Sequence, residues 1–262
     1  MYHLALATAT AIAIAIATAA AVAHYCGYRS LSARRTLSTR RRPIVVVIDG
    51  GIAVGKSTLC ARLAEMGYRV YTEGADDDAR WAAPLRLFYE DPRRWCLTLQ
   101  AAILADMRTI HDRAMREAQP DEIVFVERCP SSALTFVANS RRAGHLSDVE
   151  FATYSRLHDM LGWHPDYIVA LRLPADEAIA RMRRRNRAAE GNVDAAYVRR
   201  ISELYVGTVG RWRREVAERA VPTRRVYSVD ASPPPDRVLA RIGSIVRDIR
   251  RQRHRQQQQH YY

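Results

Sequence analysis

The chain contains almost no lysine. Of its 41 lysine and arginine residues, 40 are arginine, and the one lysine is Lys56. Either side chain supplies positive charge, so a single lysine indicates a position where the compact ammonium group itself is needed. Lys56 lies in the stretch GGIAVGKST, which runs from Gly50 to Thr58. We therefore expect this segment to carry chemistry that arginine cannot replace.

Cysteine is also scarce, with four residues in 262: Cys26, Cys60, Cys96 and Cys129. Their spacing contains neither a CxxC pair nor a cysteine–histidine arrangement, which argues against a zinc site and against a disulfide framework. Four free thiols are typical of a reducing compartment.

Acidic residues are too few to balance the arginines, and the formal net charge is +13. Such an excess often indicates a nucleic-acid or anionic-membrane partner. Here the excess is concentrated at the ends: residues 1–48 carry +6 and residues 247–262 carry +4, which leaves +3 for the body between them. We therefore expect no nucleic-acid partner for the body.

The sequence has one long apolar run, Leu4–Ala23, which is 20 uncharged residues. This run belongs to an N-terminal region, residues 1–42, whose second part is a basic linker. The length of the run could cross a bilayer, and the arginines after it would keep the following domain on the cytoplasmic side. A secretory signal, a transit segment for mitochondrial import and a disordered tail are the alternatives. At the other end, residues 247–262 are predicted to be a polar basic tail.

Residues 43–246 are predicted to form one α/β domain, because short β-branched runs alternate with longer segments of helical spacing. The five runs are Ile44–Asp49, Arg69–Glu73, Glu122–Glu127, Tyr167–Leu173 and Arg225–Val229. Nearly continuous apolar strands separated by helices predict a parallel sheet with helices on both faces. Ligands of such sheets bind beyond the carboxyl ends of the strands, where Gly50, Glu73, Glu127 and Arg128 stand.

The lysine-containing segment satisfies the phosphate-loop pattern GxxxxGK[ST] between a predicted strand and a predicted helix. Its glycines let backbone N–H groups turn toward phosphates, and the helix N-terminus adds the positive end of its dipole. Lys56 can reach the β- and γ-phosphate oxygens, and Ser57 is expected to ligate Mg²⁺ through its hydroxyl. The predicted ATP-binding loop comprises Gly50, Gly51, Ile52, Ala53, Val54, Gly55, Lys56, Ser57 and Thr58.

A second motif concerns the acceptor of the phosphoryl group. The stretch LFYEDPRRWCLTLQ, Leu87–Gln100, resembles the FYxxPxRWxxxFQ signature of the deoxynucleoside kinase family. Further similarity lies in the phosphate loop, in VERC at Val126–Cys129 and in the arginine-rich stretch Ala180–Val193. The resemblance implies a P-loop kinase fold with a five-stranded parallel sheet and an arginine-rich lid. It also implies transfer of a phosphoryl group from ATP·Mg²⁺ to the 5′-hydroxyl of a deoxyribonucleoside in nucleotide salvage.

The resemblance assigns the reacting residues one by one. Glu73 matches the general base, a carboxylate that can take the proton of the 5′-hydroxyl. Arg128 matches the arginine that orients this carboxylate and the transferring phosphoryl group. Glu127 is expected to approach Mg²⁺ through water. With Lys56, Glu73 and Arg128 make up the predicted catalytic set.

The arginine-rich stretch has two interpretations. It could be a solvated helix face, as arginine clusters often are. The resemblance favours a lid in which Arg185 and Arg187 cover the phosphates and exclude water. Arg181, one turn earlier, resembles a residue that stacks on adenine.

The predicted base pocket begins with Gln100, Ile103 and Met107, whose spacing places them on one helix face. The amide of Gln100 can pair with the edge of a pyrimidine. Met107 and Ala133 resemble thymidine kinase 2, whereas deoxycytidine kinase carries an arginine and an aspartate at these positions. An uncharged wall with room for a 5-methyl group favours thymidine, with deoxycytidine as the next choice.

Four other residues complete the predicted nucleoside site by resemblance. Tyr89 and Glu190 match the pair that binds the sugar 3′-hydroxyl. Trp81 and Phe136 match aromatic side chains around the base, although either could belong to the core. Members of the family are commonly homodimers, and viral and organellar relatives both exist.

Two other functions stay open. A nucleoside monophosphate kinase would need cations for the acceptor phosphate near the nucleoside pocket, whereas the predicted pocket suits an uncharged nucleoside. A non-catalytic P-loop protein, bound to nucleic acid or to a membrane, would show salt-sensitive DNA binding without ATP turnover.

Overall fold

The computed structural model describes residues 41–73, 82–185 and 193–259. The candidate membrane anchor at residues 4–23 lies outside the described residues, as do Trp81, Arg187 and Glu190. Within the described ranges, no helix combines the length and the apolar character that crossing a membrane requires.

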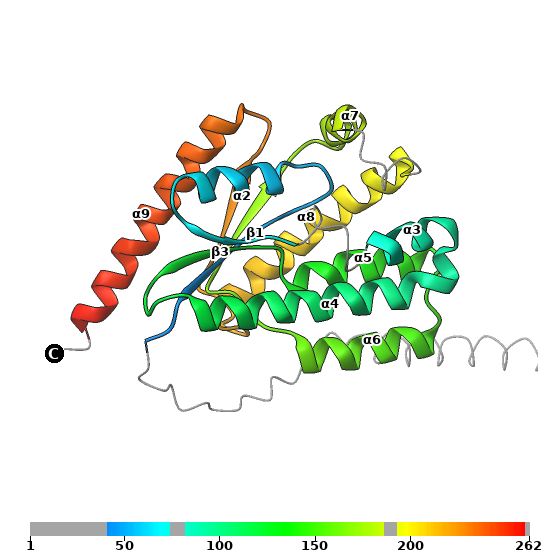
Figure 1. The fold of residues 1–262 in the computed structure, drawn as a ribbon, viewed down its shortest axis with the longest axis horizontal. Coiled ribbons are helices and arrows are strands. Elements are labelled where there is room, and N and C mark those ends of the chain that lie inside the picture. The colour runs from blue at the N-terminus through cyan, green and yellow to red at the C-terminus, as the bar shows by residue number, and fades with distance from the viewer. Residues whose placement is uncertain (1–40, 74–81, 186–192, 260–262) are drawn as a thin grey trace, which may run out of the picture. The chain divides into compact units, whose positions relative to one another are not determined.

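Five parallel strands form one sheet in the order β2–β3–β1–β4–β5 (Figure 1). The strands are β1 Ile44–Gly50, β2 Arg69–Tyr71, β3 Ile123–Glu127, β4 Tyr167–Arg172 and β5 Arg225–Asp230. All five coincide with runs predicted from the sequence. The central strand β1 pairs Ile48 with Glu127 of β3 and Gly50 with Leu171 of β4. The carboxyl ends of three strands therefore meet where the glycine loop begins.

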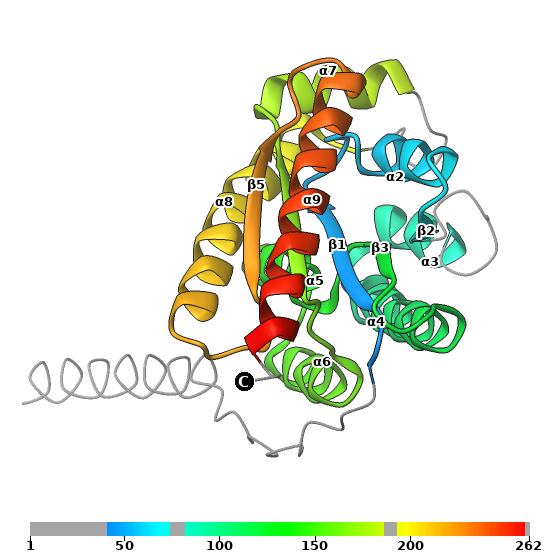
Figure 2. The ribbon, with the colours of Figure 1, turned by 90° about the vertical axis from the view of Figure 1, so that its left-hand side faces the viewer.

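Helices cover both faces of the sheet, which confirms the predicted α/β class. They are α2 Lys56–Glu65, α3 Ala82–Glu90, α4 Pro92–Glu117, α5 Pro130–Arg142, α6 Asp148–Leu161, α7 Ala175–Arg185, α8 Ala195–Ala217 and α9 Pro235–Gln259. Helices α2 and α9 pack on one face, and α4 and α8 pack on the other (Figures 1 and 2). Helix α6 packs against α4.

Side-chain hydrogen bonds cap the N-termini of helices α4, α6 and α8. Asp91 caps α4 by accepting a hydrogen bond from Arg94 N at 3.1 Å, and a proline follows at the first helical position. Ser147 and Glu150 form a reciprocal capping box at the start of α6. Asp194 accepts from Ala196 N at 3.1 Å and begins α8. These ends are set by residues within one helical turn.

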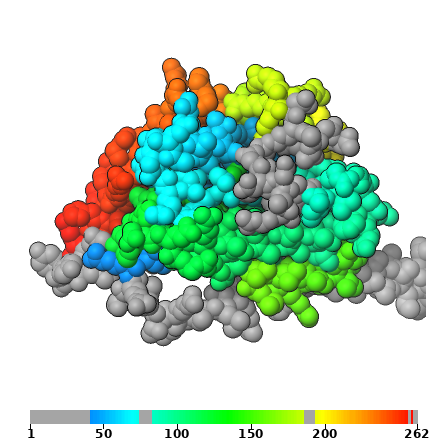
Figure 3. All heavy atoms as spheres, in the orientation of Figure 1, coloured from blue at the N-terminus to red at the C-terminus, as the bar shows by residue number. Residues whose placement is uncertain are grey.

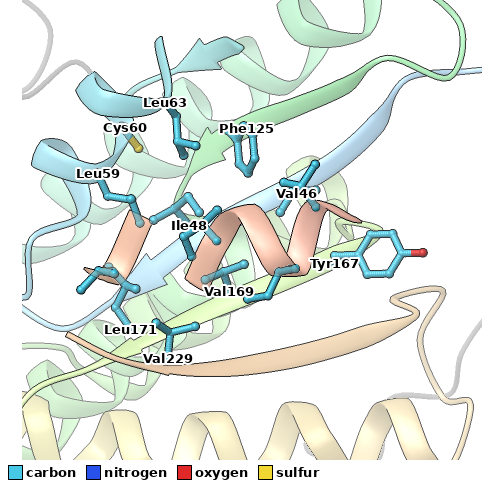
Figure 4. Close-up of a cluster of buried hydrophobic side chains, with 14 of the residues drawn as sticks. Val46, Ile48, Leu59, Cys60, Leu63, Phe125, Tyr167, Val169, Leu171 and Val229 are labelled. Atoms are coloured by element: carbon cyan, nitrogen blue, oxygen red, sulfur yellow. The ribbon is translucent and has the colours of Figure 1, made fainter. Parts of the chain in front are cut away.

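Alternate residues of β1 pack into two separate cores. Val46 and Ile48 are fully buried on the α2 side together with Leu63 (Figure 4). Val45 and Val47 are buried on the opposite side, against α4 and α8. Because both faces are covered, the strand is a continuous apolar run rather than an alternating one. The loop that follows β1 thus starts from the buried central strand of the sheet.

Helix α9 corrects the prediction of a polar tail for residues 247–259, the described part of the stretch 247–262. It continues without interruption to Gln259. Ile249 is fully buried in the core, and Asp248 accepts a hydrogen bond from Tyr227 Oη at 2.6 Å. A stripe of apolar residues at helical spacing explains the difference, because such a stripe is diluted by the arginines and glutamines between its members. In Figure 3, α9 in orange and red lies beside α2 in cyan.

Candidate active site

Residues predicted at the carboxyl ends of three strands lie together in the structure. Arg128 Nε donates to Glu73 Oε2 at 2.8 Å, and Arg128 Nη1 donates to Gly50 O at 3.1 Å. Glu127 Oε1 accepts a hydrogen bond from Ser57 Oγ at 3.0 Å, and Glu127 Oε2 accepts one from the backbone N–H of Glu73 at 3.4 Å. The acid, the arginine and the glycine loop thus form one continuous network.

The glycine loop leads into α2 with an open helix N-terminus. Gly55 precedes the helix with φ of +99°, in the left-handed region, and no side chain caps the first turn. The first N–H groups of α2 can therefore bind an anion, assisted by the helix dipole. Gly50 is required by space, because a Cβ there would lie 2.6 Å from Val54 Cγ2 and 3.0 Å from Leu171 O.

Lys56 is buried at the start of α2, and its Nζ donates to Gly51 O at 2.7 Å. The pKa of this ammonium is lowered to about 8, first by burial and next by the charge of Arg128, while nearby carboxylates oppose both effects. A phosphate oxygen would be a stronger acceptor than the loop carbonyl, because the bond would then join two opposite charges. The position therefore suits a lysine that exchanges an internal partner for an anionic ligand.

Glu73 sits in a poorly hydrated position, with 12% of its side chain exposed. Its pKa is raised to about 7, because the effect of burial exceeds the opposing effect of the Arg128 charge. A carboxylate with this pKa can accept a proton near neutrality. Arg128 has a left-handed backbone with φ of +64°, and its guanidinium carbon lies 4.9 Å from the centre of the Phe136 ring. Unusual backbone of this kind is frequent at functional sites.

A cavity of about 570 Å³ opens beside the glycine loop, between α2, α7 and the start of α9. Its lining includes Lys56 together with Arg181, Arg184 and Arg185. Arg181 Nη2 donates to the backbone carbonyl of Ala231 at 2.9 Å, which holds this side chain at the cavity wall. Several cations around a glycine loop suit a ligand that carries phosphates. Arg184 also lines this cavity, although it was not among the residues predicted for the site.

The described residues of the predicted nucleoside pocket lie on α3, α4 and α5. Gln100, Met107 and Ala133 are buried. Ile103 and Tyr89 are half-buried and pack against one apolar cluster. The expected helix face of α4 therefore points into the protein, and Phe136 on α5 connects this region to Arg128. Trp81 and Glu190 lie outside the described residues, so their predicted roles are untested.

Two buried residues of the network were absent from the predicted set. Asp49 is fully buried, and its Oδ1 accepts hydrogen bonds from Gly50 N at 2.7 Å and from Tyr205 Oη at 2.8 Å. A charged residue at the end of an apolar strand was a signal that could have pointed to Asp49. Tyr205 offers no comparable signal, because it lies on α8, 156 residues from its partner.

A second cavity of about 570 Å³ lies at the opposite end of the sheet, at the amino ends of β1 and β3. Two of its arginines are paired with acids, Arg253 with Asp121 and Arg69 with Glu122. These acids offset the positive charge at this hollow, and the glycine loop lies at the other end of β1. The cavity beside the loop is therefore the better candidate for a phosphate-binding site.

Comparison with known proteins identifies the relatives of this chain. The family model described as Deoxynucleoside kinase matches residues 46–232. Putative kinase protein 143R of Invertebrate iridescent virus 6 is 27% identical over 62% of this chain and 80% of the relative. Human mitochondrial thymidine kinase 2 is 29% identical over 63% of this chain and 64% of the relative.

The fold also matches a solved structure. Deoxyadenosine kinase from M. mycoides with bound dCTP has a TM-score of 0.62 and 17% identity, over 78% of this chain and 100% of that one. At this identity the likeness concerns the fold alone. It agrees with the five-stranded parallel sheet and its surrounding helices.

Proposed function

This chain belongs to the deoxynucleoside kinase family, and we propose that it transfers the γ-phosphoryl group of ATP to the 5′-hydroxyl of a deoxyribonucleoside, with thymidine preferred. The observation that carries the proposal is the contact between Glu73 and Arg128 beside the glycine loop. It places a carboxylate with a raised pKa next to a phosphate-binding loop. That is the arrangement required to deprotonate a hydroxyl as it attacks a bound phosphate.

In the proposed reaction, the Glu73 carboxylate accepts the proton of the 5′-hydroxyl while that oxygen forms a bond to the γ-phosphorus. The bond between the γ-phosphorus and the bridging oxygen breaks, and ADP leaves. Arg128 holds Glu73 in position through its Nε. Lys56 and the first turn of α2 bind the phosphate oxygens, and Arg184 and Arg185 line the same cavity. Positioning and charge stabilisation supply the catalysis, without a covalent intermediate.

Ser57 and Glu127 fit a Mg²⁺ site. Their side-chain oxygens lie 3.0 Å apart at the base of the loop. Mg²⁺ usually keeps several waters and takes its other ligands from phosphates and from one or two protein oxygens, so Ser57 as a ligand and Glu127 acting through a bound water would be sufficient. The described ranges contain no cluster of three His, Cys, Asp or Glu side chains suited to a metal, which agrees with a site completed by the nucleotide. When bound, Mg²⁺ neutralises charge on the phosphates.

The preference for thymidine is supported by the wall of the predicted base pocket. Met107 and Ala133 are uncharged and buried, and Gln100 is a buried amide on the same helix as Met107. A buried uncharged wall accepts a 5-methyl group and provides no ion pair for the polar edge of another base. Deoxycytidine is the nearest competitor, because its base is also a single pyrimidine ring.

The test is phosphorylation of thymidine, deoxycytidine, deoxyadenosine and deoxyguanosine by the purified full chain with ATP and Mg²⁺. We expect kcat/KM for thymidine to exceed that for the others by about tenfold or more. Thymidine monophosphate is included as a fifth acceptor, and activity on it alone would indicate a monophosphate kinase. DNA binding that weakens steeply between about 50 and 200 mM salt, without turnover, would indicate the non-catalytic alternative.

We also propose a homodimer, which light scattering checks against the chain mass of 29.7 kDa. Membrane contact through residues 4–23 and import into mitochondria are further proposals. Localisation of the full chain and of a chain starting at residue 41 distinguishes them from a cytoplasmic protein.

A further inference from the structure

Asp49 occupies a position that the reaction described above leaves without a role. It is fully buried between the glycine loop and Arg128. Its Oδ1 accepts from Gly50 N at 2.7 Å and from Tyr205 Oη at 2.8 Å, and its Oδ2 accepts a weak bond from Cys129 Sγ at 3.6 Å. Arg128 Nη1 lies 3.9 Å from Oδ1. A buried carboxylate depends on such donors, because water cannot replace them.

Arg128 therefore stands between competing acceptors. Its Nη1 bonds Gly50 O at 3.1 Å, while Asp49 Oδ1 lies farther off, at 3.9 Å. Its Nε bonds Glu73 at 2.8 Å. If Asp49 had fewer donors, the attraction between its charge and the nearby guanidinium would increase, since both groups are buried. Arg128 would then move toward Asp49 and loosen its hold on Glu73.

Tyr205 supplies one of the hydrogen-bond donors that Asp49 needs. Its side chain is 4% exposed on α8, and its ring packs edge-on against Trp212 at a centroid distance of 5.7 Å. Burial, followed by the charge of Asp49, raises the pKa of the phenol well above its ordinary value, so the O–H stays a donor at neutral pH. Packing holds the ring, and the hydroxyl is the group that meets Asp49.

We propose that Tyr205 is a positioning residue for phosphoryl transfer, which donates to Asp49 and thereby leaves Arg128 shared between the glycine loop and Glu73. The inference rests on the proposed function. Tyr205 touches no reacting atom in this scheme, and it acts through Asp49 and Arg128. Its removal should slow the chemical step without weakening the binding of either substrate.

The same helix also contacts the acceptor side. Thr208 Oγ1 and Thr135 Oγ1 of α5 share a buried hydrogen bond of 2.8 Å. Arg211 Nη2 donates to Ser131 O at the start of α5 at 3.3 Å. Helix α8 thus contacts, within two turns, both the strand end before the phosphate loop and the helix that carries Ala133. Of these three residues of α8, Tyr205 is the one whose side chain contacts Asp49, beside Arg128 and Glu73.

The experiment compares Tyr205→Phe with Tyr227→Phe in the full chain. The control loses the same kind of bond, because Tyr227 Oη donates to Asp248 at 2.6 Å, far from the glycine loop on the edge strand β5. We expect Tyr205→Phe to lower kcat about 5- to 20-fold, with the KM for ATP and for the nucleoside within about twofold. Tyr227→Phe should leave all three constants unchanged. An unchanged kcat in Tyr205→Phe, a rise in KM alone, or an equal fall in the control would overturn the proposal.

A double-mutant cycle with Asp49→Asn tests whether the hydroxyl acts through Asp49. The double variant should be no slower than Asp49→Asn alone, and independent losses that multiply would contradict the proposal. If Asp49→Asn does not fold, hydrogen exchange of the segment 44–57 in Tyr205→Phe decides instead. Exchange there should rise relative to the control, and no change counts against Tyr205. This readout needs no turnover, so an inactive wild type would argue against the proposed function alone.

Discussion

Glu73 and Arg128 are 55 residues apart in the sequence, and their side chains meet at 2.8 Å. The register of two neighbouring parallel strands explains this contact. Tyr71 of β2 lies opposite Val126 of β3, and each of the two residues stands two positions beyond that pair. The same register brings Glu127 beside the backbone of Glu73. The acid and its arginine are therefore positioned by the sheet itself.

Replacing Glu73 with Gln should lower kcat by about 10²- to 10⁴-fold, because an amide cannot accept the proton of the 5′-hydroxyl. Nucleoside binding, measured by calorimetry, should stay within about threefold, since the amide keeps the shape of the side chain and one acceptor oxygen. Substantial turnover in this variant would remove Glu73 from the role of base.

Replacing Lys56 with Arg should reduce kcat by about 10²-fold or more, a loss typical of removing one charge-stabilising donor. The ammonium is buried and bonds Gly51 O at 2.7 Å, and the wider planar guanidinium would not fit the same space. Arg86→Lys is the matched control, because Arg86 pairs with Glu90 at 2.7 Å on the exposed side of α3. A fully active Lys56→Arg would show that charge alone is needed.

Replacing Met107 with Arg together with Ala133→Asp should move the preference from thymidine toward deoxycytidine. The two positions are buried, so each single variant would place an uncompensated charge in the pocket and should be the less active. The measurement is the ratio of kcat/KM for the two nucleosides. A double variant that still prefers thymidine would argue that other residues select the base.

Two partly buried histidines should lower the free energy of unfolding when the pH is lowered from 7 toward 5.5, whereas Glu73, whose pKa is raised by burial, acts in the opposite direction in the same window. His111 stacks on Trp163 at a centroid distance of 4.6 Å, and burial lowers the pKa of its imidazole. Burial also lowers the pKa of His158. The unfolded chain, with histidine pKa values near 6.5, takes up these protons at higher pH than the folded chain, so acid favours unfolding in this window.

Urea unfolding at the two pH values checks this prediction. His111→Gln keeps the contribution of Glu73 and removes that of His111, so it should lose less free energy of unfolding between pH 7 and pH 5.5 than the wild type loses. His254→Gln, at an exposed position of α9, is the control and should leave the difference unchanged. Equal pH dependence in wild type and His111→Gln would contradict the assignment to His111.

The sequence by itself determined the five strands, the glycine loop and the start of α2 directly after that loop. Each of these depends on residues close together in the chain: an apolar run, a GxxxxGK[ST] spacing, a helix that follows directly. The expectation that Glu73 and Arg128 stand at strand ends was also confirmed: Arg128 directly follows β3, and Glu73 lies two residues after the end of β2. The single lysine, Lys56, indicated the position of this loop from the sequence alone.

Only the tertiary structure decided which of these ends meet. The strand order places β3 beside both β1 and β2, and this order brings Glu73, Arg128 and Gly50 into one network. It also decided that Tyr205 reaches Asp49 across 156 residues, and that Ile249 of the supposed tail is buried. Local patterns report what a segment can form, whereas contacts between distant segments depend on how the strands and helices pack together.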